Sequence, residues 1–209
     1  MRGLHVCLLS FCVLAGVTPS YADAPVLDCG KKSLAQAVRS LSDKNQTITF
    51  TGVCAGPIVI AIDGLTLKGV GPATIDGGGA DAITITGSSR VSLVDLEVTN
   101  GLSGIVVRDG SHVALSGVNL HDNSESGMVF QAASTGVLSG ITASHNGRGL
   151  VADDGAGITI GSSTLTGNTV KDIQLTFGSR ADLQTVVLGT YTCDATVLVR
   201  GTAGIVCPH

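Results

Sequence analysis

The stretch SRVSLVDLEVTNGLSGIVVRDG, residues 89–110, is followed by three segments of the same design. They read SHVALSGVNLHDNSESGMVFQAA (111–133), STGVLSGITASHNGRGLVADDG (134–155) and AGITIGSSTLTGNTVKDIQLTFG (156–178). A more divergent copy occupies 179–201, so the repeats start 22 or 23 residues apart. A fixed period of this length is typical of a solenoid, in which each repeat packs on its neighbours.

Each repeat contains three short runs in which apolar residues stand two apart. In the first copy these runs are Val91 and Leu93, Leu96 and Val98, and Ile105 and Val107. A spacing of two indicates strands, because successive side chains of a strand alternate between its faces. A leucine-rich repeat would instead need a helical segment in each repeat, and no part of these repeats has a period of 3.6 residues.

The sequence therefore predicts an all-β fold, a single-stranded right-handed parallel β-helix solenoid of about six to seven coils with an N-terminal capping α-helix. One core column should run through the first strands of successive coils. Its expected members are Leu93, Leu115, Leu138, Ile160 and Leu183.

An asparagine recurs near the middle of the repeats, at Asn100, Asn123, Asn146 and Asn168. At a bend between strands, asparagine tolerates the left-handed backbone conformation. Stacked amides can also bond to one another from coil to coil, and an unpaired buried amide would cost about 1–3 kcal/mol. We interpret the four residues as a structural ladder, with ordinary turn asparagines as the alternative.

The chain divides into four parts. Residues 1–24 have the charged start, short apolar run and small-residue end of a cleaved signal peptide. Residues 25–62 should hold the cap helix, over Lys32–Ser42, and the first strands. Ser33 and Gln36 form a capping box there. The coils should span 63–201, and residues 202–209 should close the far end.

Four cysteines remain after the signal peptide, Cys29, Cys54, Cys193 and Cys207. An even number in an exported chain indicates disulfides. Three pairings are open, and pairing within each end, Cys29 with Cys54 and Cys193 with Cys207, is the most economical. Zinc is the alternative, but the spacing of the cysteines does not fit a zinc motif. We expect no metal and no cofactor.

Composition limits the partners. The net charge of −4 and only 12 Lys and Arg residues argue against nucleic acid, whose binding needs a clustered basic face. No other stretch is apolar enough to span a membrane. Because residues 1–24 read as a signal peptide, a secreted or periplasmic location is expected.

The cysteine-tied first coil, the turn TIDG (74–77) and coils of the form S-x-V-x-L…N-x-x-x-G-I-x-V make the chain resemble bacterial right-handed parallel β-helix repeat proteins. That is the fold of the pectate-lyase-like superfamily. The resemblance implies polysaccharide as the commonest ligand. It implies no single activity, because the superfamily includes lyases, hydrolases, esterases, epimerases and non-catalytic proteins.

Two outward surfaces follow from the register. The third strands should carry an outer valine stripe, Val106, Val129, Val151 and Val197, which could mediate self-association. The second strands should carry two polar rows that could bind sugar hydroxyls or merely face solvent. The rows are Thr74, Glu97, Asn119, Thr142 and Thr164, and Asp76, Thr99, His121, Ser144 and Thr166.

One cluster of charged residues is a candidate site. We expect positions 99, 122 and 145 to form one column, which would stack Asp122 under His145 as a carboxylate–imidazole pair. An acid–base pair beside cations could serve an anionic sugar, and the alternative is solvated turn charge. The candidate catalytic residues are Asp122, His145 and Arg148. The candidate ligand-binding residues are His121, Asp122, Glu125, His145, Arg148 and Lys171. His209 could join a histidine in binding metal.

Three functions remain in play. The first is an exported β-helix protein that binds glycan or serves as an envelope structural module, and this is the prediction we favour. The second is a small polysaccharide lyase or hydrolase, which the short coils disfavour because no long loop walls a cleft. The third is an adhesin-like module that associates through the valine stripe.

Overall fold

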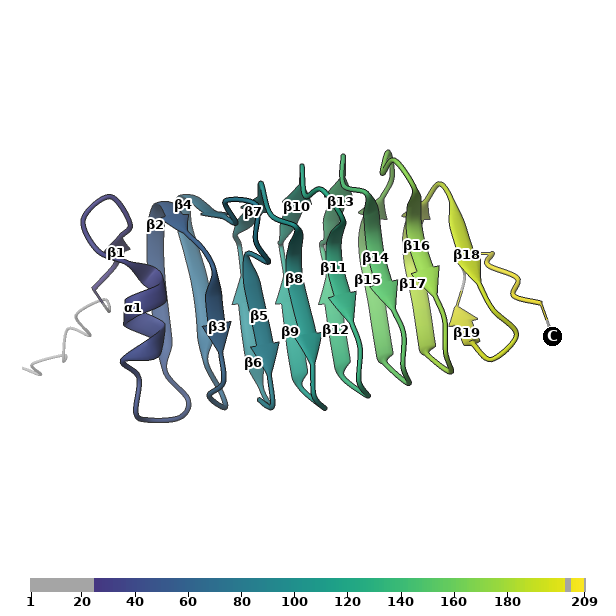
Figure 1. Cartoon of the computed structure of the whole chain (residues 1–209), viewed down its shortest axis with the longest axis horizontal. Coiled ribbons are helices and arrows are strands. Elements are labelled where there is room, and N and C mark those ends of the chain that lie inside the picture. The colour runs from purple at the N-terminus through teal and green to yellow at the C-terminus, as the bar shows by residue number, and fades with distance from the viewer. Residues whose placement is uncertain (1–24, 202–203, 209) are drawn as a thin grey trace, which may run out of the picture.

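The computed structural model describes residues 25–201 and 204–208, and in them the chain winds as a parallel β-helix (Figure 1). The predicted signal peptide and His209 lie outside the described residues. All strand pairings are parallel, and each strand pairs with its equivalents in the preceding and following coils. The predicted all-β solenoid is confirmed.

One helix, α1 (Leu34–Arg39), precedes the coils. The first strands of the coils form a stack of eight. The last strand of the stack begins a further coil that the repeat pattern did not predict. These strands are β2 (Thr47–Ala55), β4 (Thr66–Asp76), β6 (Val91–Val94), β9 (His112–Ser116), β12 (Thr135–Ser139), β15 (Gly157–Leu165), β17 (Arg180–Leu188) and β19 (Leu198–Gly201).

The second strands lie in the same sheet as the first. They are β7 (Glu97–Thr99), β10 (Asn119–His121) and β13 (Thr142–Ser144), together with the later parts of β2, β4, β15 and β17. The third strands form a separate sheet of seven. They are β3 (Ile58–Ile60), β5 (Ile83–Thr86), β8 (Ser103–Arg108), β11 (Ser126–Phe130), β14 (Arg148–Ala152), β16 (Lys171–Leu175) and β18 (Tyr191–Cys193). A short β1 (Leu27–Asp28) pairs with β2.

The core is the space enclosed by the coils. The predicted column Leu93, Leu115, Leu138, Ile160 and Leu183 is in register, and all five side chains are buried. Gly136 stands where neighbouring coils have valine or isoleucine. A Cβ there would lie 2.5 Å from the Phe130 ring, so this aromatic side chain, from the preceding repeat, fills the space that the glycine leaves.

The coil turns its corners at residues in the left-handed backbone conformation, which costs most residues about 1–2 kcal/mol. Between the first and second strands these residues are Asp95, Gly117, Gly140, Ser162 and Thr185. After the second strands they are Asn100, Asp122, His145 and Gly167. After the third strands two follow in succession, as in Asp109-Gly110, Ala132-Ala133, Asp154-Gly155 and Phe177-Gly178.

Both ends are tied as predicted. Cys29 bonds to Cys54 and Cys193 to Cys207, with Cα atoms 5.0 and 5.4 Å apart. Helix α1 buries Leu34 and Val38 against the first coil. The helix is shorter at both ends than the predicted Lys32–Ser42, because Ser33 is its N-cap, accepting a bond from the Gln36 amide, and Ser40 is its C-cap.

A buried serine column that the sequence analysis did not identify follows the third strands. Its members occupy equivalent positions in successive coils: Ser88, Ser111, Ser134, Ala156, Ser179 and Val197. The hydroxyls of Ser111 and Ser134 donate to the carbonyls of Arg108 and Val107, while that of Ser179 has no partner among the described residues. The serines that begin the repeats were the signal for it.

The outer valine stripe is only partly as predicted. Val106, Val129 and Val151 are in register, but Val197 belongs to the serine column and is buried in the core instead. It follows Ser179 in that column because the last coil is shorter between its first and third strands: Gly157 to Ile173 is 16 residues, but the equivalent span, Arg180 to Tyr191, is 11. Val106 and Val151 are themselves only 7% and 8% exposed, so the stripe offers little apolar surface, and self-association through it stays a prediction.

Candidate functional site

The asparagine ladder exists and consists of Asn123, Asn146 and Asn168. The side-chain oxygen of Asn146 accepts from both the backbone and the side chain of Asn123, at 3.1 and 2.9 Å. Asn168 receives the same two bonds from Asn146, at 3.1 and 3.0 Å. Each side chain also donates to backbone carbonyls, so all three amides are fully bonded, and those of Asn123 and Asn146 are buried.

Two residues that the sequence analysis did not assign end the ladder. At one end the Gly101 amide donates to Asn123. At the other, the buried carboxylate of Asp172 accepts from the side chain and the backbone of Asn168, and from the Thr190 amide at 2.6 Å. Burial raises the pKa of Asp172, but the hydrogen bonds from Thr190 and Asn168 outweigh it and hold that pKa below its usual range.

The prediction for Asn100 is wrong. Thr99 pairs with His121, which places Gly101 at the ladder position and Asn100 beside Asp122. The left-handed column next to the ladder is therefore 100, 122 and 145, and not 99, 122 and 145 as predicted. Asn100 bonds instead to the Asp76 carboxylate of the preceding coil, at 2.8 Å.

The predicted Asp122–His145 pair does not form. Both side chains are exposed, and in the part of the chain that the structure describes no hydrogen bond or ion pair joins them. Asp122 bonds instead to Nδ1 of His121, its neighbour in sequence, at 2.7 Å. Left-handed residues at a corner direct their side chains outward, which explains why stacking alone does not bring these two together.

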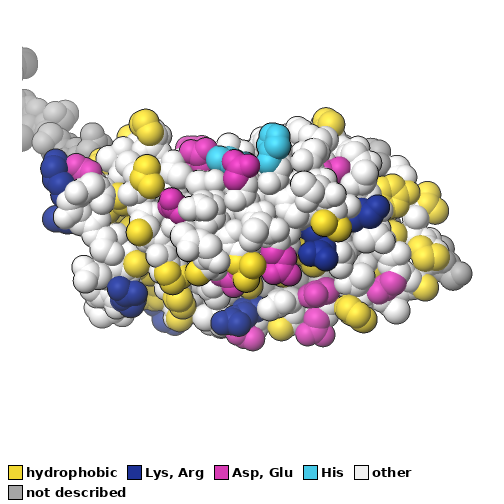
Figure 2. All heavy atoms as spheres, turned by 45° about the horizontal axis from the view of Figure 1, so that its top comes forward, with side chains coloured by type: hydrophobic (Ala, Val, Ile, Leu, Met, Phe, Trp, Pro, Cys, Tyr) yellow, Lys and Arg dark blue, Asp and Glu magenta, His cyan; other side chains and the backbone are white. Residues whose placement is uncertain are grey.

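A different cluster forms on the outward side of β4, β7 and β10. His121 lies between two carboxylates, with Nε2 bonded to Glu97 and Nδ1 to Asp122, and Glu97 also accepts from the Thr74 hydroxyl at 2.8 Å. Figure 2 shows histidine and acidic side chains gathered on this face. The polar rows predicted for the second strands are confirmed by the register, and Glu97 and His121 pair diagonally across them.

The two ring bonds stabilise the imidazolium form. Burial lowers the pKa of His121, but the bonds to Asp122 and Glu97 raise it overall. The bonds from His121 and Thr74 lower the pKa of Glu97. Because both ring nitrogens are engaged by carboxylates, neither is free to accept a proton from a substrate, so His121 is poorly placed to act as a base.

The other predicted ligand residues lie elsewhere. Arg148 and Lys171 occupy equivalent positions in the neighbouring strands β14 and β16. Arg148 Nε donates to the side chain of Gln174 at 2.9 Å, along the outer face of the second sheet. Glu125 is exposed in the turn before β11. The structure therefore does not gather the six predicted residues into one site, and a ligand role for them stays a prediction. Among residues 25–201 and 204–208, no group of three or more His, Cys, Asp or Glu side chains is placed to hold a metal.

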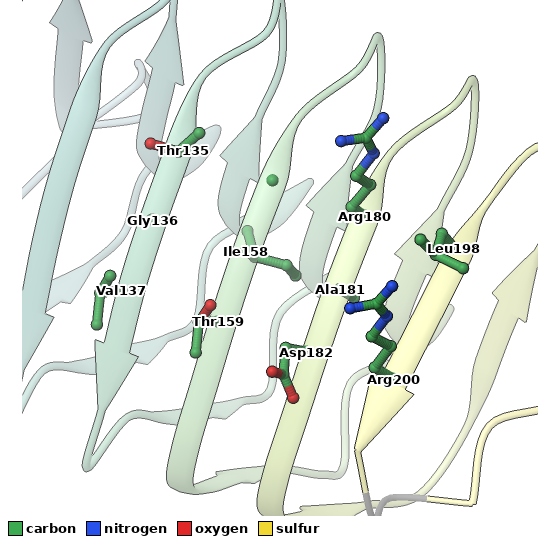
Figure 3. Close-up of a pocket in the computed structure, with 11 residues that line it drawn as sticks. Thr135, Gly136, Val137, Ile158, Thr159, Arg180, Ala181, Asp182, Leu198 and Arg200 are labelled. Atoms are coloured by element: carbon green, nitrogen blue, oxygen red, sulfur yellow. The ribbon is translucent and has the colours of Figure 1, made fainter.

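A groove of about 410 Å³ lies on the outer face of the first sheet, over β12, β15, β17 and β19 (Figure 3). We call it the arginine groove. Its outward residues form two rows. They are Thr135, Gly157, Arg180 and Leu198, and Val137, Thr159, Asp182 and Arg200. Gly157 has no side chain, so the first row leaves a gap between Thr135 and Arg180.

The arginine groove is basic. Figure 3 shows Arg180 and Arg200 projecting from neighbouring strands on the face that also carries Thr159 and Asp182. Neither guanidinium forms an ion pair with any residue in the described ranges, whose ion pairs involve other cations. Asp182 accepts from Gln184 at 3.3 Å. These arginines were not predicted because both lie in the divergent copy 179–201, whose register the repeat pattern leaves open.

Comparison with known families places the chain. Residues 62–189 match the family described as "Right handed beta helix region", so the chain belongs to that family and its coils are right-handed. No curated protein matches its sequence significantly. A crystal structure of alginate lyase from Paenibacillus sp. str. FPU-7 is similar in fold, with 13% identity over 87% of this chain and 97% of that one and a TM-score of 0.40. No helix in the described residues is long and apolar enough to cross a bilayer.

Proposed function

We propose that this chain is an exported β-helix protein that binds an anionic glycan in the arginine groove and does not cleave it. The observation that carries the proposal is the pair of exposed arginines, Arg180 and Arg200, on one groove without an acidic partner for either among the described residues. Planar guanidinium groups bind carboxylate and sulfate groups with two parallel hydrogen bonds.

The rest of the groove suits a sugar chain. Thr135 and Thr159 offer hydroxyl groups, while Val137 and Leu198, 61% and 47% exposed, offer apolar surface to the C–H faces of sugar rings. The groove crosses four stacked strands, so a linear polymer can lie along the solenoid axis and contact successive coils. Polar groups at fixed positions with apolar surface between them are the usual composition of a ligand site.

Binding fits this groove better than hydrolysis. Glycoside hydrolysis uses two carboxyl groups about 5–10 Å apart, and Asp182 is the carboxylate among the residues that line the groove. The cluster of Glu97, His121 and Asp122 is on another part of the surface, over β7 and β10, and its groups are bonded to one another. An enzyme would also need its substrate fixed in one pose.

Export is supported by the two disulfides, which persist in oxidising compartments. The leader-like segment 1–24 supports it independently from the sequence. A secreted or periplasmic chain would meet polysaccharides of the envelope or the surroundings, which agrees with the ligand proposed for the groove.

The test is calorimetric titration of the protein with defined oligosaccharides of polygalacturonate and alginate, and with neutral glucan oligosaccharides of equal length. We expect binding of an acidic chain that weakens as salt rises, and a loss of about tenfold or more in affinity for Arg180→Ala/Arg200→Ala, since a charge-assisted bond is worth about 1.5–3 kcal/mol.

The matched control is Arg39→Ala/Arg108→Ala, which removes the same charge from surfaces outside the groove. If both double variants lose glycan affinity equally, the effect comes from net charge alone, and the arginine groove is rejected as the binding site. Shortening of the chains, followed by mass spectrometry, would favour the enzyme. Absence of binding to every glycan would favour the envelope structural role.

A further inference from the structure

One exposed loop carries a motif that the glycan-binding proposal does not use. The loop joins α1 to β2 at the N-terminal end of the solenoid (Figure 1) and contains Asp43-Lys44-Asn45-Gln46-Thr47. Asn45 and Thr47 form the sequence N-x-T, the acceptor motif for N-linked glycosylation. Of the asparagines in the chain, Asn45 alone is followed two residues later by threonine or serine.

The structure presents this motif to solvent. All five residues of the segment are exposed, and Thr47 is the first residue of β2. The side-chain oxygen of Asn45 packs against Gly64, where a Cβ would clash with it. No residue in the described ranges forms a hydrogen bond with the Asn45 side chain, so its amide nitrogen is not engaged in the fold.

The loop is also held in place. The Asn45 backbone amide donates to the Asp63 carbonyl at 3.1 Å, Lys44 pairs with the Asp63 carboxylate at 2.8 Å, and the Gln46 carbonyl accepts from Thr66 at 2.8 Å. Asn45 itself has φ 59°, the left-handed conformation that asparagine tolerates. The motif is therefore displayed on an anchored corner, outside the stacked coils.

The ladder asparagines show the contrast. Asn123 and Asn146 are 1% and 0% exposed, and their amide nitrogens donate to carbonyl oxygens inside the stack. Attachment of any group to them would break the ladder. Modification of the Asn45 amide nitrogen thus breaks no hydrogen bond among the described residues, and Asn45 is the asparagine that carries the acceptor motif.

We propose that Asn45 is an N-glycosylation site, an inference that rests on the proposed export because the transfer takes place outside the cytoplasm. The donor is a polyprenyl-pyrophosphate-linked oligosaccharide. Asn45 Nδ2 forms a bond to C1 of the first sugar, the bond from C1 to the pyrophosphate oxygen breaks, and the polyprenyl pyrophosphate leaves with the electron pair. The amide nitrogen gives up one proton to a base of the oligosaccharyltransferase.

The site is also compatible with glycan binding by the protein. The arginine groove lies over β12 to β19, towards the opposite end of the solenoid, so a sugar chain on Asn45 leaves the groove open.

The test is expression of the full chain, residues 1–209, in a bacterium supplied with an oligosaccharyltransferase and its lipid-linked oligosaccharide. Intact mass and the mass of the peptide that contains Asn45 are measured. We expect the glycan mass on that peptide in the unmodified sequence and in Asn119→Gln, the control outside any acceptor motif. The glycan should be lost in Asn45→Gln and in Thr47→Val, which each remove one essential residue of the acceptor motif.

The state of the same sample separates the two proposals. A chain with its leader removed and its four cysteines oxidised, but without glycan, overturns the Asn45 site and leaves export standing. A chain that keeps its leader and free thiols overturns export and the site with it. Glycan binding in the arginine groove is measured separately and does not depend on either result.

Discussion

The polar side chains at two turns of each coil are hydrogen-bonded in different ways. At the turn after the second strands, buried asparagines bond to one another from coil to coil. At the turn after the third strands, buried serines bond mainly to carbonyl groups. The serine column accordingly contains an alanine, Ala156, and a hydroxyl without a partner, Ser179. Side chains that depend on one another tolerate little change, whereas side chains that bond separately can be replaced one at a time.

The largest expected effect is at the ladder. Asn146→Ala removes the acceptor of two Asn123 groups and the donor to Asn168, leaving buried polar atoms unpaired. We expect a loss of at least about 1–3 kcal/mol in the free energy of unfolding. Ser134→Ala removes one bond, to Val107, and should cost about 1 kcal/mol. Chemical denaturation measures both.

The control for the ladder is Thr142→Ala, an exposed position on the same coil as Asn146, which should change stability by within about 0.5 kcal/mol. If Asn146→Ala and Ser134→Ala lose the same free energy, the contrast between a coupled and an independent column fails.

The second prediction concerns the strained corner before the serine column. Ala132 and Ala133 are both left-handed, and the equivalents of Ala133 in other coils are Gly110, Gly155 and Gly178. Ala133→Gly should therefore stabilise the protein by about 1 kcal/mol, because glycine adopts this conformation without a steric penalty. Thermal unfolding should show a higher midpoint.

The matched control is Ala114→Gly, at an exposed strand position of β9, which should destabilise by about 0.5–1 kcal/mol. The two substitutions should therefore change the free energy of unfolding in opposite directions. A loss of stability in Ala133→Gly would show that the strain at this corner is not the controlling term.

The smallest effect is outside the ladder turn, at Glu97 and His121. The raised pKa of His121 contributes stability that is full below the unfolded pKa of about 6.5 and is lost as pH rises through the folded value. The lowered pKa of Glu97 contributes stability above about 4.3 that is lost as pH falls through its folded value. The pair should stabilise most between these limits, by no more than about 1 kcal/mol at this partly exposed site.

Unfolding free energies measured across pH check this. His121→Gln should lower the plateau between the two limits and weaken the loss of stability outside them, whereas His145→Gln, at an exposed histidine without a hydrogen bond to its ring among the described residues, should leave the profile unchanged. Identical profiles for the unmodified chain and His121→Gln would mean that the cluster is solvated charge.

The sequence predicted the core better than the surface, for physical reasons. The core column from Leu93 to Leu183 was predictable from the two-residue spacing of apolar residues and the fixed repeat length, because the inward positions must be apolar in every coil. Asn100 was misplaced because turns differ in length. Asn123 lies three positions before Ser126, but Gly101 lies only two positions before Ser103, the residue with which Ser126 pairs. A constant period cannot keep each column in register across such a difference.

Surface sites depend on information that the repeat does not contain. The diagonal bond between Glu97 and His121 needs side-chain directions as well as register. The arginine groove needs the gap at Gly157 and the pairing of β17 with β19, where the repeat has diverged. Val197 was misassigned in the same coil. The cysteine pairs were predictable, since a linear stack keeps its two ends too far apart for any other pairing.

The position of the disulfides has a kinetic consequence. In a stack where each coil contacts only its neighbours, local unfolding begins at the outermost coils and proceeds inward. Cys29–Cys54 joins β2 to the chain before it, and Cys193–Cys207 joins β18 to the tail. The middle coils carry no such link among the described residues. Both ends of the solenoid are thus crosslinked covalently where unfolding would begin, so a protease meets closed ends while the bonds stay oxidised.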